Sequence, residues 1–393
     1  MGILQLDSHK DRHNDRGLVN KLDDSSSNPA TQFLCDMTGR KHTVLAGRAS
    51  AAIWAALRAR GIKGQWVLMP ANMCYIVAWA VIQSGNLPYL VDIDPLTGNI
   101  SPETLDLVQI ESPAALIVCH MYGLGAPIAV LSEWANQRGI FVIEDATLAL
   151  GATVDDRPAG SWGDMSLFSF GEGKIVDVGT GGAFLCDDSE LARKVQVGLD
   201  GLPLWSNHLE QLRDQWTELY WLLHQYEEAN SQLATMYPML FRIFGDITRY
   251  QLPASGLDPL IKLLSALEPN LDHRLEMASL YDEYFRVMQV RTLMRSKGHV
   301  IWRYPLLVSP EDRDALLQVL WENGILASRW YPSLSSMLSA LSPTIGKQTT
   351  PGADRLGAEI INLPVDHPVD GETIKRTAET VQVYFHEKRK RTK

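Results

Sequence analysis

Reactive side chains follow two apolar, strand-like runs in the middle of the sequence. Asp145 comes directly after Glu144 at the end of one run, and Ser169 lies at the end of a second, Phe168-Ser169-Phe170. Lys174 follows five residues after Ser169, in a loop flanked by glycines. A loop lysine is usually a solvated charge, but a partly desolvated amine beside a carboxylate and a hydroxyl forms an imine with an aldehyde. The spacing therefore predicts an aldehyde-binding site if the fold brings these groups together.

A second pattern, near residue 47, is typical of an anion site. Gly47 and Arg48 precede an Ala-rich helical stretch that begins with Ala49 and Ser50. The free N–H groups and the dipole at a helix N-terminus favour a negatively charged group. Taken alone, the stretch is a buried helix. Taken with the lysine and the carboxylate, it completes what pyridoxal phosphate needs: an amine for the aldehyde, an acid for the ring nitrogen and donors for the phosphate.

The elements expected to position these groups form an α/β fold. From residue 43 to about 190, short β-branched runs alternate with helical patterns, which predicts a mostly parallel central sheet with helices on both faces. In such a sheet ligands bind at the carboxyl ends of the strands, where Asp145 and Ser169 lie. The predicted strands are Trp66–Met69, Tyr89–Ile93, Ala115–Cys119, Phe141–Glu144, Ser166–Phe170 and Ala183–Cys186.

Changes of pattern along the chain predict two domains and an arm. Residues 1–30 are polar and contain a serine run, which is typical of a flexible arm. A large domain is expected over residues 31–265 and a smaller α+β domain over 266–393, ending in a basic tail that we interpret as a solvated end. Within the large domain the segment 197–260 is helical, with an apolar stripe made of Leu209, Leu212, Trp216, Leu219 and Leu223.

Composition excludes several classes of protein. The 393-residue chain carries 36 Lys and Arg against 46 Asp and Glu, and its net charge of −10 disfavours nucleic-acid binding. No run approaches the roughly 20 apolar residues of a membrane span. The four cysteines form no CxxC pair and indicate no disulfide scaffold. We therefore expect a cytoplasmic protein that binds neither a membrane nor a metal ion.

Longer motifs carry a resemblance to a known family. Their order and spacing match over roughly residues 43–190, and the most specific are Val142-Ile143-Glu144-Asp145-Ala146, Gly160-Ser161-Trp162-Gly163-Asp164, Phe168 to Lys174, and Gly179-Thr180-Gly181-Gly182. In these segments the sequence resembles the DegT/DnrJ/EryC1/StrS family of pyridoxal-phosphate-dependent sugar aminotransferases. The resemblance implies the aspartate aminotransferase fold, fold type I.

The resemblance also implies a role for each candidate residue. Lys174 is the lysine that binds the aldehyde of pyridoxal 5'-phosphate, and Asp145 is the partner of its ring nitrogen. Ser169 is a phosphate ligand, together with Ala49 and Ser50, which stand where the family has a Gly-Thr pair. This substitution keeps what phosphate binding requires, because serine retains the hydroxyl and backbone N–H groups do not depend on the side chain.

Several positions depart from the family. Leu148 replaces a glutamine near the cofactor's phenolic oxygen, Cys74 replaces the aromatic residue that stacks on the ring, and Thr180 replaces a glutamate. We predict that Tyr75 substitutes for the stacking residue. The segment 197–260 lacks the family's HG loop and GxNxRM motif, so its Trp-rich helices are core, a dimer interface or a rebuilt substrate pocket.

The resemblance implies a homodimer that transfers an amino group from an amino acid, glutamate, to a keto sugar attached to a nucleotide. Arg48, Arg303 and Arg329 are candidates for the donor's carboxylate or an acceptor phosphate, and each is also a candidate for a structural ion pair. We interpret His120 as a satisfied strand-end histidine in preference to a catalytic base.

Three alternative functions remain open at the level of sequence. One is action of the same kind of enzyme on a non-sugar substrate. A second is dehydration of a deoxysugar, against which Lys174 argues, because the dehydrating relatives carry histidine at that position. The third is a cofactor-binding regulatory protein, which the changes at Leu148 and Cys74 and the loss of the motifs in 197–260 favour.

Overall fold

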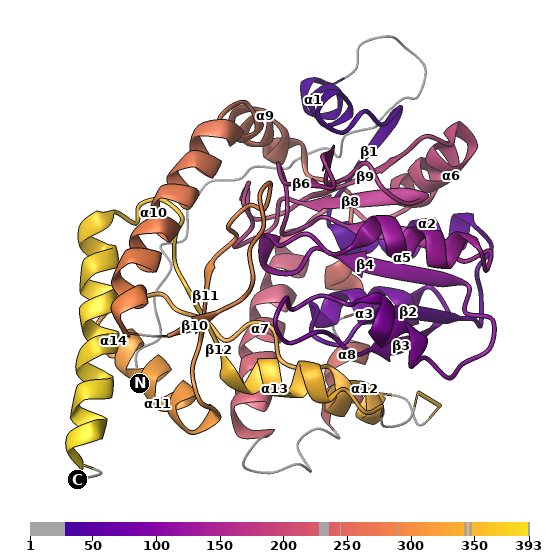
Figure 1. Cartoon of the computed structure of the whole chain (residues 1–393). Helices are drawn as coiled ribbons and strands as arrows, with labels where there is room; N and C mark the ends of the chain where they lie inside the picture. Colours follow the sequence, from indigo (N-terminus) through magenta and orange to yellow (C-terminus); the bar gives the residue numbers. More distant parts are fainter. Residues whose placement is uncertain are drawn as a thin grey trace.

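The computed structural model describes residues 28–227, 236–243, 245–288, 290–341, 344–345 and 348–391. Its larger region is built around a seven-stranded sheet with the order β1-β9-β8-β5-β4-β2-β3 (Figure 1). The strands are β1 (His42–Ala46), β2 (Trp66–Pro70), β3 (Leu87–Val91), β4 (Ala115–Cys119), β5 (Phe141–Asp145), β8 (Met165–Ser169) and β9 (Gly182–Cys186).

The direction of the strands confirms the predicted α/β fold. β3, β2, β4, β5 and β8 pair in parallel, and β9 runs antiparallel to both of its neighbours, β8 and β1. Each of the six predicted strands is present, with ends that shift by at most two residues. The edge strand β1 was not predicted. A short hairpin, β6 (Thr153–Val154) and β7 (Arg157–Pro158), follows β5.

Helices pack on this sheet through small or apolar side chains. They are α1 (Pro29–Thr38), α2 (Ala49–Ala59), α3 (Tyr75–Gln83), α4 (Pro102–Asp106), α5 (Ile128–Asn136) and α6 (Ser189–Asp200). α2 packs against α3 and α6. Its residues Ala51, Ala52, Ala55 and Ala56 are at most 3% exposed. Because alanine has only a methyl group, neighbouring elements approach the axis of α2 closely.

The first turn of α2 lies against the first residue of β9. A Cβ on Gly182 would lie 2.3 Å from the backbone nitrogen of Ala49. The preceding Gly181 has a φ of +105° and donates its N–H to the carbonyl of Gly47 at 2.7 Å. The glycines of the 179–182 motif therefore let the helix begin at the edge where β8 ends.

The second region has its own sheet and its own core. β10 (Arg291–Thr292), β11 (Tyr304–Leu307) and β12 (Ile360–Leu363) form an antiparallel sheet. The helices α10 (Leu267–Met288), α11 (Pro310–Glu322) and α14 (Gly371–Arg391) lie beside it (Figure 1). Tyr281, Leu316, Ile361 and Ile374 are buried in this core. The boundary predicted at residue 266 falls between α9 (Leu257–Ser265) and α10.

A stretch of the C-terminal third returns to the first region. α12 (Ser335–Leu341) and α13 (Pro351–Glu359) contribute Leu338 and Leu356 to the core of the larger region. The carboxylate of Asp92, just after β3, accepts hydrogen bonds of 2.9 Å from the N–H groups of Gly352 and Ala353. This contact with the N-terminus of α13 holds the helix on the larger region.

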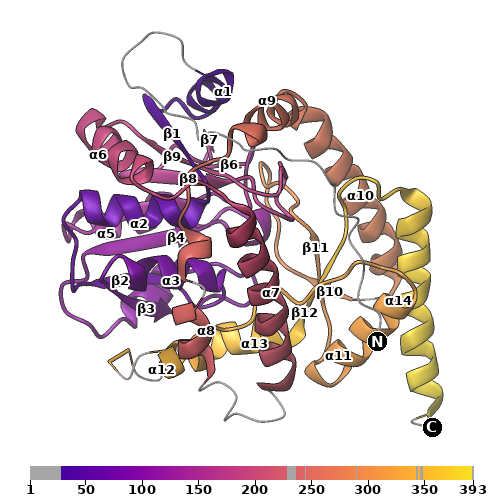
Figure 2. The same cartoon turned by 180° about the vertical axis from the view of Figure 1, so that it is seen from behind.

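The described part of segment 197–260 is largely helical, with α7 (Asn207–Glu227) and α8 (Tyr237–Ile243). Figure 2 shows α7 alongside the seven-stranded sheet, at its border with the second region. Leu209 and Trp216 of the predicted stripe are buried, but Leu219 is 44% exposed, and Tyr220 is buried in its place at 3%. The helix turns this way because the Tyr220 ring stacks on Tyr75 of α3.

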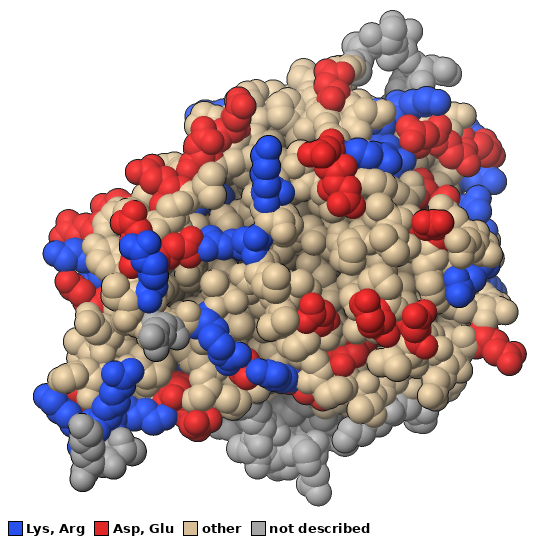
Figure 3. Space-filling model, in the orientation of Figure 1, with Lys and Arg blue, Asp and Glu red and all other residues tan. Residues whose placement is uncertain are grey.

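The chain ends differ from the predicted arm and tail. α1 begins at Pro29, inside the range 1–30 assigned to the arm, and residues 1–27 lie outside the described residues. The basic tail continues α14 to Arg391, and Lys388 forms an ion pair with Asp312. Figure 3 shows Lys and Arg gathered where α14 ends. None of the described helices combines the length and the apolar character of a membrane span.

Gly182→Ala is expected to destabilise the protein, because its Cβ would overlap the backbone of Ala49. The free energy of unfolding, measured in urea, should fall by about 1–3 kcal/mol, as for an overpacked core. The control is Gly198→Ala in α6, whose Cβ would lie 3.6 Å from Cβ of Ala55, an ordinary contact. Alanine favours a helix over glycine by about 1 kcal/mol, so the control should lose no stability. Equal stability of the two variants would contradict the described contact.

Candidate active site

The carboxyl end of β5 carries a buried acid, Asp145, and both Asp145 and the predicted lysine are hydrogen-bonded to Thr147. Asp145 is 2% exposed. Its Oδ1 accepts a hydrogen bond of 3.0 Å from the N–H of Thr147, and its Oδ2 has no hydrogen-bond partner among the described residues. Lys174, in the loop after β8, donates from Nζ to Oγ1 of Thr147 at 3.5 Å. The structure therefore brings Lys174 and Asp145 together, as their positions in the sequence predict.

The N-terminus of α2 lies at the same edge and is open to an anion. No side chain caps this helix. The N–H groups of Ala51 and Ala52 turn back to the carbonyl of Arg48, whereas the N–H of Ser50 has no partner in the described part of the chain. The Ser50 hydroxyl donates to the carbonyl of Thr248 at 3.4 Å. A helix N-terminus of this kind attracts negative charge.

Ser169 is the candidate that links the lysine loop to this helix. It ends β8 and stands opposite Gly182 in the β8–β9 register. Gly182 is the residue against which Ala49 begins α2. Oγ of Ser169 accepts a hydrogen bond of 3.5 Å from the N–H of Gly171, at the start of the lysine loop. The predicted phosphate ligands Ala49, Ser50 and Ser169 thus belong to two adjoining backbone segments.

Cys74 is electrostatically coupled to both parts of the site. Burial raises the pKa of its thiol, and the positive charges of Lys174 and Arg48 act in the opposite direction. Burial lowers the pKa of the Arg48 guanidinium, but Tyr250, Tyr75 and Cys74 raise it, and the net shift is upward. None of these neighbours is a carboxylate. Arg48 therefore precedes α2 with phenol and thiol neighbours, and it forms no ion pair with a carboxylate of the described residues.

Tyr75 lies in a cluster of aromatic side chains. Its ring centroid is 4.1 Å from that of Tyr220, 5.0 Å from that of Trp216 and 6.3 Å from that of Trp330. Phe241 closes the cluster at 5.9 Å. Burial raises the pKa of the Tyr75 hydroxyl well above its usual range. The ring packs against α7 and the segment around residue 330, and its role as the cofactor's stacking residue stays a prediction.

Sequence reasoning missed Tyr250, which belongs to the divergent segment. Its hydroxyl lies 2.8 Å from Oγ1 of Thr180, and that same Oγ1 donates to the carbonyl of Gly47 at 3.0 Å. A Cβ on Gly47 would lie 2.2 Å from the Tyr250 carbonyl oxygen. The divergent segment therefore reaches the entrance of α2. The signal that could have found it is Gly47 itself, since a glycine before a helix indicates a close neighbour.

The remaining candidates have structural neighbours. Nη1 of Arg329 lies 3.5 Å from Oδ1 of Asp314, an ion pair of the kind that the structural alternative expects. Nη1 of Arg303 donates to the carbonyl of Leu326 at 3.0 Å. Leu148 is 2% exposed and offers no polar side-chain atom where the family has glutamine. Of the three arginines, Arg48 is the one whose charge acts to lower the pKa of the Cys74 thiol.

His120 is fully buried and both of its ring nitrogens are bonded, which confirms the interpretation as a satisfied histidine. Nδ1 accepts from the N–H of Ala126 at 3.0 Å, and Nε2 therefore carries the proton that it donates to Oε1 of Glu144 at 3.0 Å. Glu144 also accepts from the N–H groups of Gly160 and Trp162, each at 2.7 Å. This network ties the turn before β8 to the sheet.

The sequence also matches the model of a known protein family. The model of the DegT/DnrJ/EryC1/StrS aminotransferase family matches residues 30–214 and 259–382. The chain belongs to this family. The unmatched stretch, 215–258, falls within the segment 197–260 that the sequence marked as divergent.

Individual relatives agree with this family assignment. The chain is 35% identical to the pleiotropic regulatory protein of Geobacillus stearothermophilus over 40% of its length, a match that spans 43% of that relative. It is 25% identical to UDP-N-acetyl-3-dehydro-alpha-D-glucosamine 3-aminotransferase of Acidithiobacillus ferrooxidans, over 89% of the chain and 86% of the relative. The crystal structure of the aminotransferase TlmJ of Streptoalloteichus hindustanus has the same fold, with a TM-score of 0.72 at 20% identity over 92% of each chain.

The residues present fit the cofactor that the family implies, pyridoxal phosphate. The free Oδ2 of buried Asp145 suits a protonated ring nitrogen, because a buried carboxylate requires a cationic or hydrogen-bonded partner. The open N–H of Ser50 and the hydroxyl of Ser169 suit a phosphate. Lys174 supplies the amine. Leu148 offers no polar side-chain atom where the resemblance to the family implies a glutamine.

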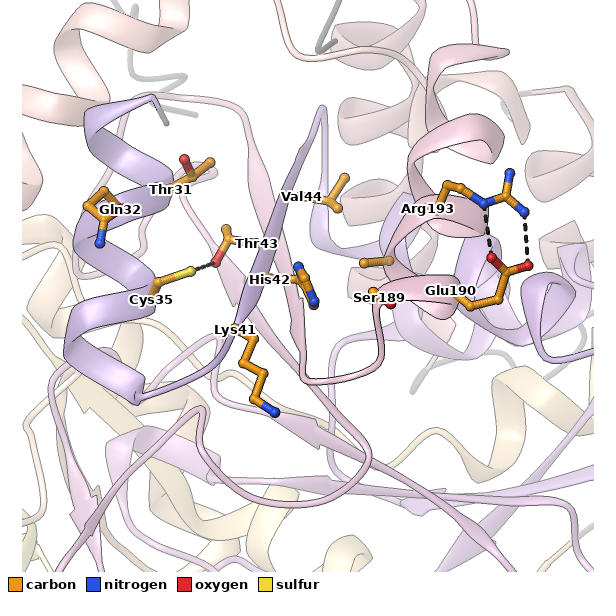
Figure 4. A pocket seen from close by; sticks show the side chains of 11 residues that line it. Thr31, Gln32, Cys35, Lys41, His42, Thr43, Val44, Ser189, Glu190 and Arg193 are labelled. Carbon is orange, nitrogen blue, oxygen red and sulfur yellow. Dashed lines mark hydrogen bonds and ion pairs between the residues drawn. The ribbon is translucent and has the colours of Figure 1, made fainter. Parts of the chain in front are cut away.

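A groove at the outer edge of the sheet lies apart from this constellation. It runs between α1, β1 and α6 (Figure 4), and Lys41, His42 and Ser189 are among the residues that line it. Its polar groups include two bonded pairs, Glu190 with Arg193 and Cys35 with Thr43. None of the predicted site residues lines this groove, so the candidate active site stays at the carboxyl ends of β5 and β8.

Glu144→Gln is expected to destabilise the protein, because Glu144 has a structural role and not a catalytic one. The amide nitrogen of glutamine would face one of the three donors that the carboxylate accepts, and a buried donor left unsatisfied costs about 1–3 kcal/mol. The free energy of unfolding, measured in urea on the cofactor-free protein, should fall by that amount. Glu190→Gln on the exposed side of α6 is the control and should change it by less than about 1 kcal/mol. A stable Glu144→Gln protein would contradict the structural role of this network.

Proposed function

We propose that the protein is a pyridoxal-phosphate-dependent aminotransferase that moves an amino group from glutamate to a keto sugar attached to a nucleotide. One observation carries the proposal: Lys174 and the buried Asp145 converge on Thr147, beside the uncapped N-terminus of α2. An amine, an acid and an anion site in one place are what this cofactor requires. Family membership supports the same activity.

Each of these residues has a distinct task. When bound, the cofactor supplies an aldehyde that accepts the donor's amino group and a ring that withdraws electrons from the donor's α-carbon. Lys174 would anchor the cofactor covalently through Nζ and, once released, would carry the proton that leaves the α-carbon. Asp145 would hold the ring nitrogen in its protonated form. Ala49, Ser50 and Ser169 would bind the phosphate through backbone N–H groups and hydroxyls.

The substrate proposal rests on charge and on the relatives. Arg48 is the arginine proposed to bind the carboxylate of the donor, because it immediately precedes α2 and forms no ion pair with a carboxylate of the described residues. A keto sugar as acceptor is supported by the name of the full-length relative from Acidithiobacillus ferrooxidans, an aminotransferase of a UDP-linked sugar. Arg303 and Arg329 remain lesser candidates for an acceptor phosphate.

The proposal also includes a homodimer in the cytoplasm. The homodimer is implied by the resemblance to the family, and the cytoplasmic location by the cysteine usage and by the lack of an apolar run of membrane-span length in the sequence. Leu219, Leu222 and Met239 on α7 and α8 are between 44% and 55% exposed, and apolar side chains in such positions are compatible with a contact to a second copy.

A cofactor-binding regulatory protein is the second candidate function. The relative from Geobacillus stearothermophilus, matched over 40% of the chain, is named a pleiotropic regulatory protein. The apolar Leu148 and the thiol of Cys74 would weaken the hold on the cofactor that turnover requires. This candidate shares the covalent lysine with the aminotransferase and differs from it only in lacking turnover.

Lys174→Ala is expected to abolish covalent attachment of the cofactor. The original protein mixed with pyridoxal phosphate should show a visible absorbance band, and borohydride should lock the cofactor on Lys174, as identified by peptide mass spectrometry. The variant should show neither, because Lys174 is the amine that the described residues bring to Thr147, beside Asp145. Lys194→Ala, on the exposed side of α6, is the matched control and should behave like the original. A Lys174→Ala protein that keeps full turnover would reject the proposal.

A panel of acceptors tests the substrate class. Glutamate should bleach the visible band of the loaded protein, and a nucleotide-linked keto sugar should restore it, whereas free keto acids other than the glutamate product should restore it at least tenfold more slowly. Restoration by keto acids alone would favour a non-sugar substrate. A band that glutamate leaves unchanged would favour the regulatory protein, provided that borohydride still traps the cofactor on Lys174.

A further inference from the structure

The peptide carbonyls on both sides of Lys174 accept hydrogen bonds from side chains outside the lysine loop. The indole Nε1 of Trp302, shortly before β11, donates to the carbonyl of Gly173 at 2.7 Å. Nδ2 of Asn270, in the first turns of α10, donates to the carbonyl of Ile175 at 2.7 Å. Neither side chain contacts the amine itself, so both act on the backbone that carries it.

A buried arginine joins these two donors. Nε of Arg274 donates to Oδ1 of Asn270 at 2.9 Å, which orients the amide so that its Nδ2 faces Ile175. Nη1 of Arg274 donates to the carbonyl of Trp302 at 2.7 Å, which fixes the backbone that presents the indole. Arg274 is 4% exposed and Trp302 is also 4% exposed. The planar guanidinium holds both partners at fixed directions, as its fork geometry allows.

The loop that receives these bonds is short and closed by its own contacts. Lys174 N–H donates to the carbonyl of Gly171 at 3.2 Å, and Gly173 N–H donates to Oδ2 of Asp177 at 2.7 Å. Gly173 has a φ of +73°, which glycine adopts without strain. Val178 N–H donates to the carbonyl of Phe170 at 3.0 Å and closes the loop. Three amide protons therefore report whether the loop is held.

We infer that Asn270, Arg274 and Trp302 form a clamp that positions Lys174 for its reaction, and we call these three residues the lysine clamp. The inference rests on the proposed function of Lys174. The amine must reach the cofactor aldehyde and then the donor's α-carbon, and displacement of a reacting group by about 1 Å can lower a rate about a hundredfold. Because the clamp comes from α10 and the chain before β11, it also ties the second region to the reacting amine.

Trp302→Phe is the decisive variant, since it keeps an aromatic ring and removes the donor to Gly173. Hydrogen exchange, followed by mass spectrometry on the cofactor-free protein, should speed up at least tenfold at the amides of Gly173, Lys174 and Val178. In the loaded protein, the rate at which saturating glutamate bleaches the visible band should fall at least tenfold. The glutamate concentration for half-maximal rate should change less than twofold, because the clamp positions the amine and leaves donor binding intact.

The matched control is Trp321→Phe. The Trp321 indole also donates to a backbone carbonyl, that of Ala327 at 2.8 Å, but it lies on α11 away from the lysine loop. In the Trp321→Phe protein, hydrogen exchange at the amides of the lysine loop and the rate of bleaching by glutamate should equal those of the original protein. Asn270→Ala is the second variant, at a half-buried position, and it decides the question if Trp302→Phe does not fold. It should speed up exchange at the same three amides.

The outcomes separate the clamp from the function on which it rests. If the original protein traps cofactor on Lys174 and neither variant changes loop exchange or bleaching rate, the clamp is wrong and the proposed function stands. If the original protein traps no cofactor on Lys174, the proposed function is wrong, and loop exchange alone then decides whether the clamp holds the loop. If the variants lose thermal stability but show unchanged exchange of the loop amides at a temperature where the protein is folded, these residues are ordinary structural contacts and the clamp is wrong.

Discussion

The carboxylate of Asp145 is nearly removed from water, and the rest of the site depends on how that buried group is balanced. A buried carboxylate is unfavourable unless hydrogen bonds or a cation compensate it. The N–H of Thr147 provides one bond, and Oδ2 has no partner among the described residues. The acid can lie this deep because it ends the central strand β5, between β4 and β8. In the proposed function, a protonated ring nitrogen would complete this balance, and Lys174 would hold the cofactor beside the acid.

The antiparallel return of β9 brings the other candidate site residues to the edge of the sheet where this acid lies. Because β9 pairs with β8, the chain must reverse after Ser169, and Lys174 lies in that reversal. The same return brings Gly182 against Ala49, which places the N-terminus of α2 beside the loop. The amine, the acid and the anion site thus come from one sheet edge. The carbonyls of Gly173 and Ile175, on both sides of Lys174, accept hydrogen bonds from the indole of Trp302 and from a side chain of α10.

Local patterns in the sequence predicted the parts of the site that lie at strand ends, and missed those that depend on contacts between distant segments. The apolar runs that end at or shortly before Asp145, Ser169 and Lys174 are rich in buried residue types. These runs are strands in the structure. Tyr250 and Trp302 act through single hydrogen bonds to segments 70 and 129 residues away, which leave no period in the sequence. Leu219 was placed in the buried stripe by spacing, but the stack of Tyr220 on Tyr75 turned the helix instead.

Tyr75, the neighbour of the departure at Cys74, packs against the divergent segment. Its ring stacks on Tyr220 and lies at a tilt to Trp216, both of α7. Trp330 joins the same stack from the C-terminal third of the chain. Restoring an aromatic residue at 74 alone would crowd this cluster, because its members are in contact and interiors tolerate little added volume. The edge that carries Asp145 and Lys174 therefore keeps the side chains that the proposed function requires, and the divergent segment packs beside it through aromatic side chains.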